Sequence, residues 1–557
     1  MKFRSLFMTV AAGLLLAGCS NNEPATPGEV PFEGDGDMYV SLKFTNGTRA
    51  VDYENGSADE SAIRDVTIYF FDDAKKYLGS GVGVIQKEEG STGNVEKKVK
   101  VEVTNDLVKE GKYALAVVNK VAALDAIAAG VSYDEFNAAL TIASTADAKQ
   151  GFMMTNSVYT EDGTNEYNLV AISANNWAEK GNAAAEAAVV PLEIYVERVT
   201  SKVTLGVDIT TENTEATVNV ISWGLNVMNK SYYPVKKLQS FLAEYNTFTN
   251  WSGITNQFWN KASDHRSFWA VDPNYTTALD AQDADVFFYP AVADMKYAAN
   301  GTTAVYTLEN TMQYNQQRVP TTTNAVLFAQ YLPNDLGLST DKNWYVWKNR
   351  NYTGANLLSS IVSQVNQKYY KKTGVQDEQG QDQYTNLELS DFEITFGNGT
   401  DVKIGDVVVG NTGKAVVTLK AGVEAYVPVD IVKPNWIWNQ VTAATVNTDL
   451  LAAAGGEGAI TTYVNGYCYY EIPIQQFADE VAWNGTDDPL TAKHMMRYGV
   501  VRNHVYKLVV NSIMSPGRPV TGTTVDPTPR NDDKKEYELK VNINVLAWAV
   551  RTQNVGL

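Results

Sequence analysis

Cysteine and histidine are scarce in this chain, which limits the chemistry that it can support. The sequence has two cysteines among 557 residues and three histidines, His265, His494 and His504. No two histidines have a metal-binding spacing, and neither a G-x-S-x-G motif nor a complete phosphate loop is present. We therefore expect a protein that is not an enzyme, with no catalytic residue, cofactor or metal. Glycosidase carboxylates, which have no local signature, and a bound calcium ion stay open.

Basic residues are outnumbered by acidic ones. The chain has 45 Lys and Arg against 64 Asp and Glu, a net charge of −19. This balance disfavours nucleic acid and anionic lipid as partners, because both repel an acidic surface. Aromatic residues are plentiful, with 31 Tyr, 18 Phe and 11 Trp. Because aromatic side chains favour strands, the composition indicates a mainly β protein.

The chain also lacks an apolar run long enough to span a membrane. Near its start, Lys2 and Arg4 precede a short apolar run over residues 6–16, which ends just before Cys19. This pattern is typical of a lipoprotein signal peptide, residues 1–19, whose last cysteine is lipidated. We therefore expect an exported lipoprotein that contacts the membrane only through the lipid on Cys19.

A first strand is predicted soon after the signal peptide. Apolar residues alternate with polar ones over residues 38–45, which indicates a strand with one buried face. The buried positions are Met38, Val40, Leu42 and Phe44. A polar turn that carries Arg49 follows directly. Residues 20–49 therefore comprise a flexible tether and this first strand.

Strand patterns recur at short intervals through most of the remaining chain. We predict strands at residues 66–71, 113–118, 192–196, 203–207, 217–223, 286–289, 325–331, 415–419, 467–474 and 501–510. A capping box at Ser132 and Glu135 and an apolar stripe over residues 357–365 predict short helices. Since the strand pattern restarts near residue 204, we predict two β domains, 50–203 and 204–513. Polar insertions over residues 230–350 suggest exposed loops or an adhesive face.

The C-terminal end carries a long amphipathic strand. Residues 514–535 are rich in Pro, Thr and charges and predict a loop. Residues 536–557 follow, with alternating apolar positions. This strand either closes the sheet of its own domain or completes a neighbour's sheet by strand addition. The candidate donor residues are Leu539, Val541, Ile543, Val545, Leu546, Trp548 and Val550.

Several short segments carry a family resemblance. They are the sequence before Cys19, the Arg49 loop, YALAVVN at 113–119, EIYVERVTSK at 193–202, YGVVRN at 498–503 with Tyr506, and VLAWAV at 545–550. Together they resemble the fimbrillin, or type V pilin, family, and most closely its minor-fimbrium shaft subunits. The resemblance implies two tandem transthyretin-like β-sandwich domains with short helical insertions. It also implies a cut between Arg49 and Ala50 by an arginine-specific protease.

The function implied by the resemblance is structural. After the cut, a subunit loses its first strand, and the C-terminal strand of a neighbour fills the groove. The product is a homopolymer on the cell surface, which works with accessory tip and anchor subunits and adheres to host or bacterial surface ligands. The alternative is a monomeric surface lipoprotein, a tip adhesin, or a module that binds glycans or a host ligand.

Overall fold

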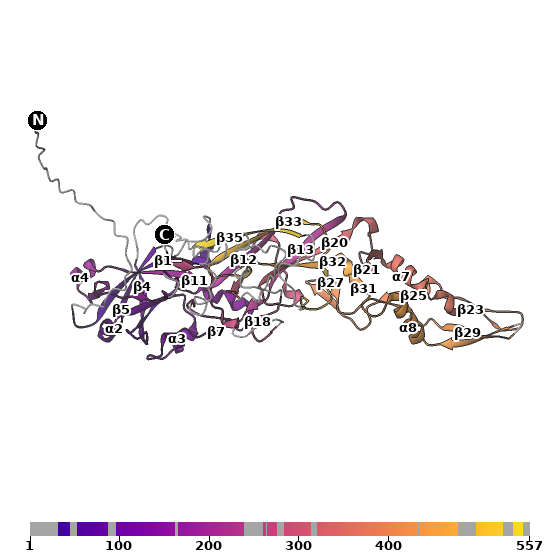
Figure 1. Ribbon diagram of the computed structural model, residues 1–557, viewed down its shortest axis with the longest axis horizontal. Coiled ribbons are helices and arrows are strands. Elements are labelled where there is room, and N and C mark those ends of the chain that lie inside the picture. Colours follow the sequence, from indigo (N-terminus) through magenta and orange to yellow (C-terminus); the bar gives the residue numbers. More distant parts are fainter. Residues whose placement is uncertain are drawn as a thin grey trace, which may run out of the picture.

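We describe the fold from a computed structural model of the chain (Figure 1). The described residues are 32–44, 53–86, 96–161, 165–238, 260–262, 265–275, 283–312, 320–432, 435–476, 497–526, 528 and 539–549. They form a mainly β molecule that is long and narrow. In Figure 1 the N-terminal strands lie at one end, a second group of strands lies in the middle, and a thin arm extends to the other end.

The N-terminal strands form a closed ring. Their order is β1 (Gly36–Phe44), β11 (Leu192–Arg198), β8 (Met154–Asn156), β6 (Tyr113–Val118), β3 (Val66–Phe71), β4 (Tyr77–Ile85) and β5 (Glu96–Val103). β5 pairs with β1 and so closes the ring, which we call the N-terminal ring. Two short strands, β9 (Val170–Ala171) and β10 (Trp177–Glu179), pair with β6 and β1.

Short helices flank this ring, as the sequence predicts. They are α1 (Ala58–Ser61), α2 (Asn105–Glu110), α3 (Tyr133–Phe136) and α4 (Ala183–Ala188). The capping box before α3 is confirmed, because the Ser132 hydroxyl accepts a hydrogen bond from the Glu135 amide. The ring interior holds one apolar cluster, to which β1 contributes Met38, Val40, Leu42 and Phe44.

The middle of the molecule consists of two sheets that share one core. The larger sheet has the order β19 (Asn300–Leu308), β12 (Thr200–Val207), β33 (His504–Ile513), β35 (Leu539–Ala549) and β2 (Tyr53–Asn55). The smaller has the order β13 (Ala216–Asn226), β20 (Asn324–Pro333), β32 (Tyr467–Pro473) and β34 (Arg518–Pro519). Leu508 of the first sheet and Trp223 of the second belong to the same buried cluster. We call this pair of sheets the second sandwich.

Part of the polar insertion after residue 230 is buried and not exposed. Val235, Phe268 and Trp269 pack against Leu115 and Val117 on the outer face of the N-terminal ring. The short strand pairs here are β7 (Leu140–Thr141) with β15 (Ser231–Tyr232), β14 (Met228–Asn229) with β18 (Phe287–Phe288), and β16 (Asn260–Lys261) with β17 (Arg266–Ser267). The insertion therefore joins the ring to the second sandwich.

The arm is a separate unit within residues 344–463. Its strands are β21 (Trp344–Trp347), β22 (Arg350–Thr353), β23 (Tyr370–Gln376), β24 (Asp382–Asn386), β25 (Phe392–Thr395), β28 (Val416–Leu419), β29 (Ala425–Val432), β30 (Asn435–Val441) and β31 (Ile460–Tyr463). Its helices, α7 (Gly354–Val362) and α8 (Ala443–Ala454), share a core of their own. The hairpin of β26 (Asp401–Ile404) and β27 (Val407–Asn411) lies at its base and packs on the second sandwich.

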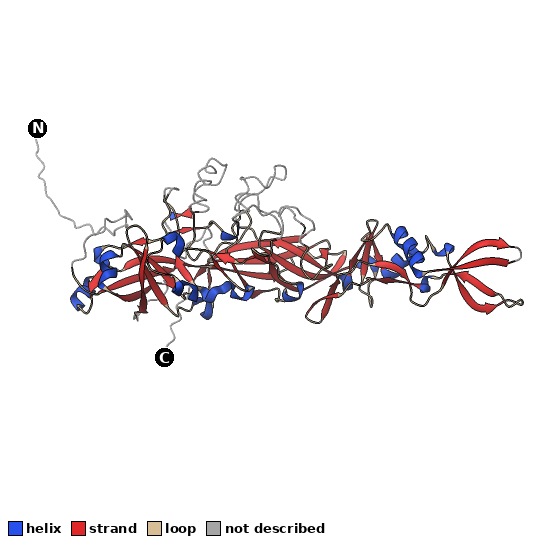
Figure 2. Cartoon of the chain, turned by 90° about the horizontal axis from the view of Figure 1, so that it is seen from below, coloured by secondary structure: helices blue, strands red, loops and turns tan. Residues whose placement is uncertain are grey.

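The predicted helix in this region is confirmed, since α7 buries Leu357, Ile361 and Val362. At the far end of the arm, the hairpins β23–β24 and β29–β30 diverge (Figure 2). Their backbones pair at Tyr370 and Tyr426.

Candidate functional site

β1 is an internal strand of the N-terminal ring although it lies at the start of the chain. It pairs in parallel with β11, where Val40 faces Leu192 and Phe44 faces Val196. On its other side it pairs antiparallel with β5 over residues 36–43. Met38, Val40 and Leu42 are fully buried, as predicted for the inward face. Because β1 lies between β5 and β11, which do not pair with each other among the described strands, its removal would leave two unpaired edges and an apolar groove.

The outward face of β1 is held by charged and polar contacts. The ammonium of Lys100 on β5 lies 2.9 Å from the carboxylate of Asp37, which is fully buried, and 3.3 Å from that of Glu186 on α4. The hydrogen bond to Asp37 raises the pKa of Lys100. The Tyr39 hydroxyl donates to Glu186 at 3.0 Å. β1 is therefore recognised by charge as well as by apolar packing.

Two further contacts continue along the same face. The Ser41 hydroxyl donates to Glu96, and the Lys43 ammonium pairs with Glu193. The carboxylates of Glu96 and Glu193 thus accept hydrogen bonds from the outward residues at positions 41 and 43 of β1.

The predicted processing residues lie beyond what the structure describes. Cys19, Arg49 and Ala50 all fall outside the described residues. β1 ends at Phe44 and β2 begins at Tyr53. The eight residues between them, 45–52, connect a strand of the N-terminal ring to the edge of the second sandwich.

The C-terminal strand lies in the sheet of its own chain. β35 pairs antiparallel with β33, from Leu539 opposite Ile513 to Ala547 opposite His504. Leu539, Val541 and Ile543 are partly buried against the core of the second sandwich. Of the other candidate donor residues, Val545, Leu546 and Trp548 belong to β35, where only the backbone is described, and Val550 lies outside the described residues.

β2 covers the outer edge of β35, a contact that the sequence did not reveal. Residues 53–55 pair in parallel with residues 547–549. Glu54 pairs with Lys507 of β33 and lies 3.3 Å from Lys202 of β12. The candidate displaced strand and the candidate donor strand thus lie in different sheets, and the short segment 45–55 runs from the first of them to the outer edge of the second.

The junction between ring and second sandwich contains buried ion pairs. Lys236 lies 3.0 Å from Glu197, and Arg502 lies 3.0 Å from Glu309. Arg198 donates to the Glu60 carbonyl at 3.0 Å. Three of these residues belong to the segments EIYVERVTSK and YGVVRN, which explains physically why charged residues interrupt two otherwise apolar patterns. Sequence reasoning did not assign them, because their partners are far away along the chain.

Burial changes the protonation equilibria of this junction. It lowers the pKa of Arg198 to about 9 and lowers that of Lys236. It raises the pKa of Asp272 to about 7. Burial also lowers the pKa of His504 well below its usual value, and the nearby Arg266 guanidinium acts in the same direction. These shifts reflect the removal of charged groups from water where the two halves meet.

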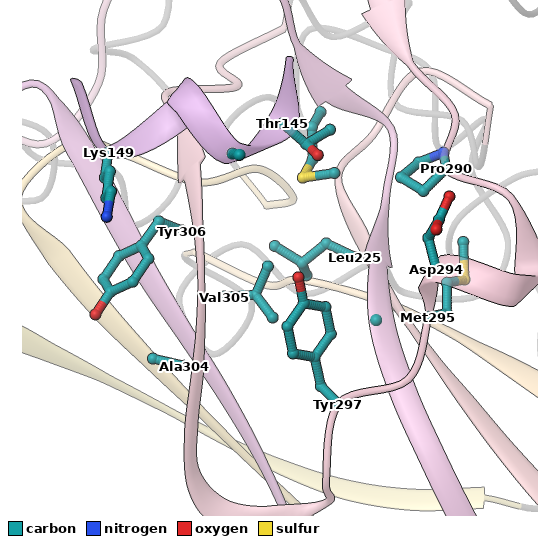
Figure 3. A pocket seen from close by; sticks show the side chains of 13 residues that line it. Thr145, Lys149, Leu225, Pro290, Asp294, Met295, Tyr297, Ala304, Val305 and Tyr306 are labelled. Atoms are coloured by element: carbon teal, nitrogen blue, oxygen red, sulfur yellow. The ribbon is translucent and has the colours of Figure 1, made fainter. Parts of the chain in front are cut away.

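A cavity of about 220 Å³ lies beside this junction (Figure 3). Thr145 and Lys149 line it from the 3₁₀ segment η2 (Thr145–Phe152), and Tyr306 lines it from β19. Figure 3 shows Lys149 next to Tyr306, with Asp294 on the opposite side. Ligand sites usually enclose about 300–1,000 Å³, so this cavity is small for one. We assign it no ligand.

Two further properties hold for the part of the chain that the structure describes. No group of three or more His, Cys, Asp or Glu side chains is arranged to hold a metal ion. No helix among these residues is long and apolar enough to cross a bilayer.

Comparison with known families identifies the chain. The profile of major fimbrial subunit protein (FimA) matches residues 38–221, and that of major fimbrial subunit protein type IV, fimbrillin, C-terminal, matches residues 461–554. The chain belongs to the fimbrillin family. Fimbrillins are subunits of cell-surface fimbria, and such structural subunits are in general not enzymes. The first match starts within β1 and the second contains all of β35, so most of β1 and the whole of β35 lie inside the fimbrillin segments.

Solved structures of low identity were also found. They include two from Parabacteroides distasonis ATCC 8503: a proposed cell adhesion protein (11% identity, 93% of this chain and 98% of that chain, TM-score 0.37) and a fimbrial assembly protein (10%, 71% and 99%, 0.24). A proposed adhesin from Bacteroides ovatus has 10% identity over 72% of this chain and 94% of that chain, with a TM-score of 0.18. No curated protein sequence matches this fimbrillin.

Proposed function

We propose that this fimbrillin is the shaft subunit of a surface fimbrium, of the minor-fimbrium type, and that it polymerises by protease-triggered donor-strand exchange. The observation that carries the proposal is the position of β1. It closes the N-terminal ring, yet it is linked to all the strands that follow it in the chain through residues 45–52 alone. A cut after Arg49 would therefore detach β1 without touching any other strand.

The proposed maturation follows the order of the chain. Cys19 is lipidated, the lipoprotein reaches the outer membrane, and an arginine-specific protease then cuts between Arg49 and Ala50. Until the cut, β1 covers an apolar groove that would otherwise cause aggregation. The ring and the second sandwich are the two transthyretin-like β-sandwich domains of this proposal. Accessory tip and anchor subunits, and host or bacterial surface ligands, are its expected partners.

The proposed donor is β35 of the next subunit. Among the described strands, only the three-residue β2 pairs with the outer edge of β35. Release of β35 would therefore break few backbone hydrogen bonds on that edge. Four inward apolar side chains at ~1.5–3 kcal/mol each give an upper bound of about 6–12 kcal/mol for filling the groove. Since groove and donor are different surfaces, the contact does not close on itself and propagates as a filament.

The test is the substitution Arg49→Ala in the producing cell. We expect lipidated monomers and a loss of SDS-resistant ladders, because β1 stays attached and keeps the groove filled. Arg530→Ala, which removes an arginine from the loop before the C-terminal strand, is the matched control and should assemble normally. Filaments of normal length from the Arg49→Ala chain would refute protease-triggered exchange.

A second candidate, a tip adhesin or ligand-binding lipoprotein, is favoured by one feature of the arm. Tyr384 and Trp438 stack at 4.3 Å between ring centroids, with Tyr370 packed edge-on against Trp438 at 4.7 Å. Partly exposed aromatic stacks of this kind suit sugar or protein ligands. Deletion of residues 370–441 separates the two functions: a shaft subunit should still polymerise, whereas an adhesin should lose surface binding.

A further inference from the structure

The polar face of β1 contacts charged side chains of the ring that would select the strand that replaces β1. Lys100 and Glu186 hold Asp37 and Tyr39, as described above. Neither Lys100 nor Glu186 belongs to residues 1–49, so both remain when β1 leaves. The opened groove would then present a lysine and a glutamate side by side. Lys100 and Glu186 pair with each other at 3.3 Å, but Lys100 has then lost Asp37 and Glu186 has lost the Tyr39 hydroxyl. An incoming strand that supplies an acid and a donor at these two positions restores both contacts.

Residues 538–545 have the same pattern as residues 37–44. The two sequences are ELKVNINV and DMYVSLKF. Each begins with an acidic residue and has apolar residues at the four inward positions, and the outward positions between them hold polar residues or tyrosine. We propose that residues 538–545 of a second copy of this chain replace residues 37–44 in the same direction and the same register. Glu538 then takes the place of Asp37 beside Lys100. This inference rests on the proposed donor-strand exchange and specifies its geometry.

The register gives each outward donor residue a suitable partner. Lys540 falls at the position of Tyr39, beside Glu186. Glu538, Lys100, Glu186 and Lys540 then form a row of alternating charge. Asn542 falls at the position of Ser41 and Asn544 at that of Lys43. Their amide groups can donate to Glu96 and Glu193, which accept from Ser41 and Lys43 in the intact chain.

Other registers fail on charge or on burial. A shift by one residue turns the apolar side chains outward. A shift by two puts Lys540 beside Lys100 in one direction. In the other direction Glu536 falls beside Lys100, but Glu538 then lies beside Glu186, which brings two like charges together. With the strand reversed and its four apolar residues inward, Leu546 falls beside Lys100, which then gains no acidic partner.

The proposed direction of the donor strand in the neighbouring ring also agrees with the shape of the molecule. β35 begins at Leu539, which faces Ile513 at the end of β33 remote from the ring junction. A donor that swings out about this end points away from its own N-terminal ring (Figure 1). It would enter the free end of a second ring and run toward that copy's second sandwich. β1 runs the same way, because it is parallel to β11, which leads into β12.

Disulfide trapping tests the register directly. In the intact ring, Ser41 faces Lys98 of β5, so the proposal places Asn542 opposite Lys98 of the neighbour. The purified chain with Lys98→Cys and Asn542→Cys is cut with an arginine-specific protease and mildly oxidised. We expect at least tenfold more reducible ladder than with Lys98→Cys combined with Lys540→Cys or Asn544→Cys. Stronger trapping at position 540 or 544 would overturn the register.

Charge reversal is the second measurement. Glu538→Lys leaves the ring of the intact chain unchanged and should reduce assembly at least tenfold, and adding Lys100→Glu should restore it. Lys98→Glu, on the same face but opposite Asn542, is the control and should assemble. Normal assembly of the Glu538→Lys chain overturns the inference, while the proposed function stands. Failure of the unmodified, cleaved chain to form any ladder overturns the proposed function itself.

Discussion

At the scale of single residues, the junction depends on charges removed from water. His504 shows this most simply, because it is fully buried between Arg266 and the Arg502 carbonyl, which accepts from its Nδ1 at 2.9 Å. Burial lowers its pKa most, and the charges of Arg266 and Lys236 act in the same direction. The folded chain therefore keeps His504 neutral at pH values where the unfolded chain protonates it.

This depressed pKa predicts a loss of stability in mild acid. The unfolded histidine titrates near ~6.5, so its contribution is fully present above that pH and is lost as the pH falls below it, by about 1.4 kcal/mol per pH unit. We expect the difference in free energy of unfolding between the wild type and His504→Gln to shrink accordingly from pH 7.5 to 5.5. Urea unfolding of both proteins measures it, and the comparison cancels the opposite titration of Asp272. A constant difference would contradict a neutral, buried His504.

The sequence predicts periodic features of this protein much better than its junction. Alternation over residues 38–45 identified β1 and its inward side chains, and a capping box identified α3. Both signals are local, so neighbouring residues suffice. The pairing of Arg502 with Glu309 joins residues 193 positions apart. Nothing in either local sequence indicates the other, so tertiary structure was needed to find it.

At the scale of elements, β2 and β35 show the same limit of prediction from local sequence. The alternation over residues 537–545 predicted a strand, and β35 is that strand. The sequence left open which sheet it joins, since the same inward face suits either core. β2 has three residues, too few for a pattern, and its role depends on where β35 lies.

We predict that β2 stabilises the end of β35 through Glu54. Its carboxylate bridges Lys202 and Lys507, a partly buried arrangement worth about 1 kcal/mol. Glu54→Ala should therefore speed amide exchange of residues 547–549 about fivefold, since 1.4 kcal/mol corresponds to a tenfold change. Hydrogen exchange with mass spectrometry measures this. Glu457→Ala, an exposed glutamate in the arm, should leave β35 unchanged. Equal exchange in both variants would show that β2 does not hold the strand.

At the scale of the whole molecule, the arrangement links the loss of β1 and the release of β35 to one short segment. Residues 45–52 connect the strand that fills the ring to the strand that covers the donor. The arm extends from the end of the second sandwich at which β35 begins (Figure 1). A donor released there would run beside the arm, so the arm of one subunit would flank the ring of the next.

The stability of the N-terminal ring should therefore depend on the assembly state. Loss of β1 exposes a groove whose four apolar contacts contribute at most about 6–12 kcal/mol. We expect calorimetry of the cleaved chain, after β1 is removed in urea and the urea is dialysed away, to show one transition at a lower temperature and one unchanged. A synthetic peptide of residues 36–44 should restore the first transition, and so should assembly into filaments. A scrambled peptide is the control, because it has the composition without the alternation. If the cleaved chain without β1 melted like the intact one, β1 would not be the strand that holds the ring closed, and its exchange could not drive polymerisation.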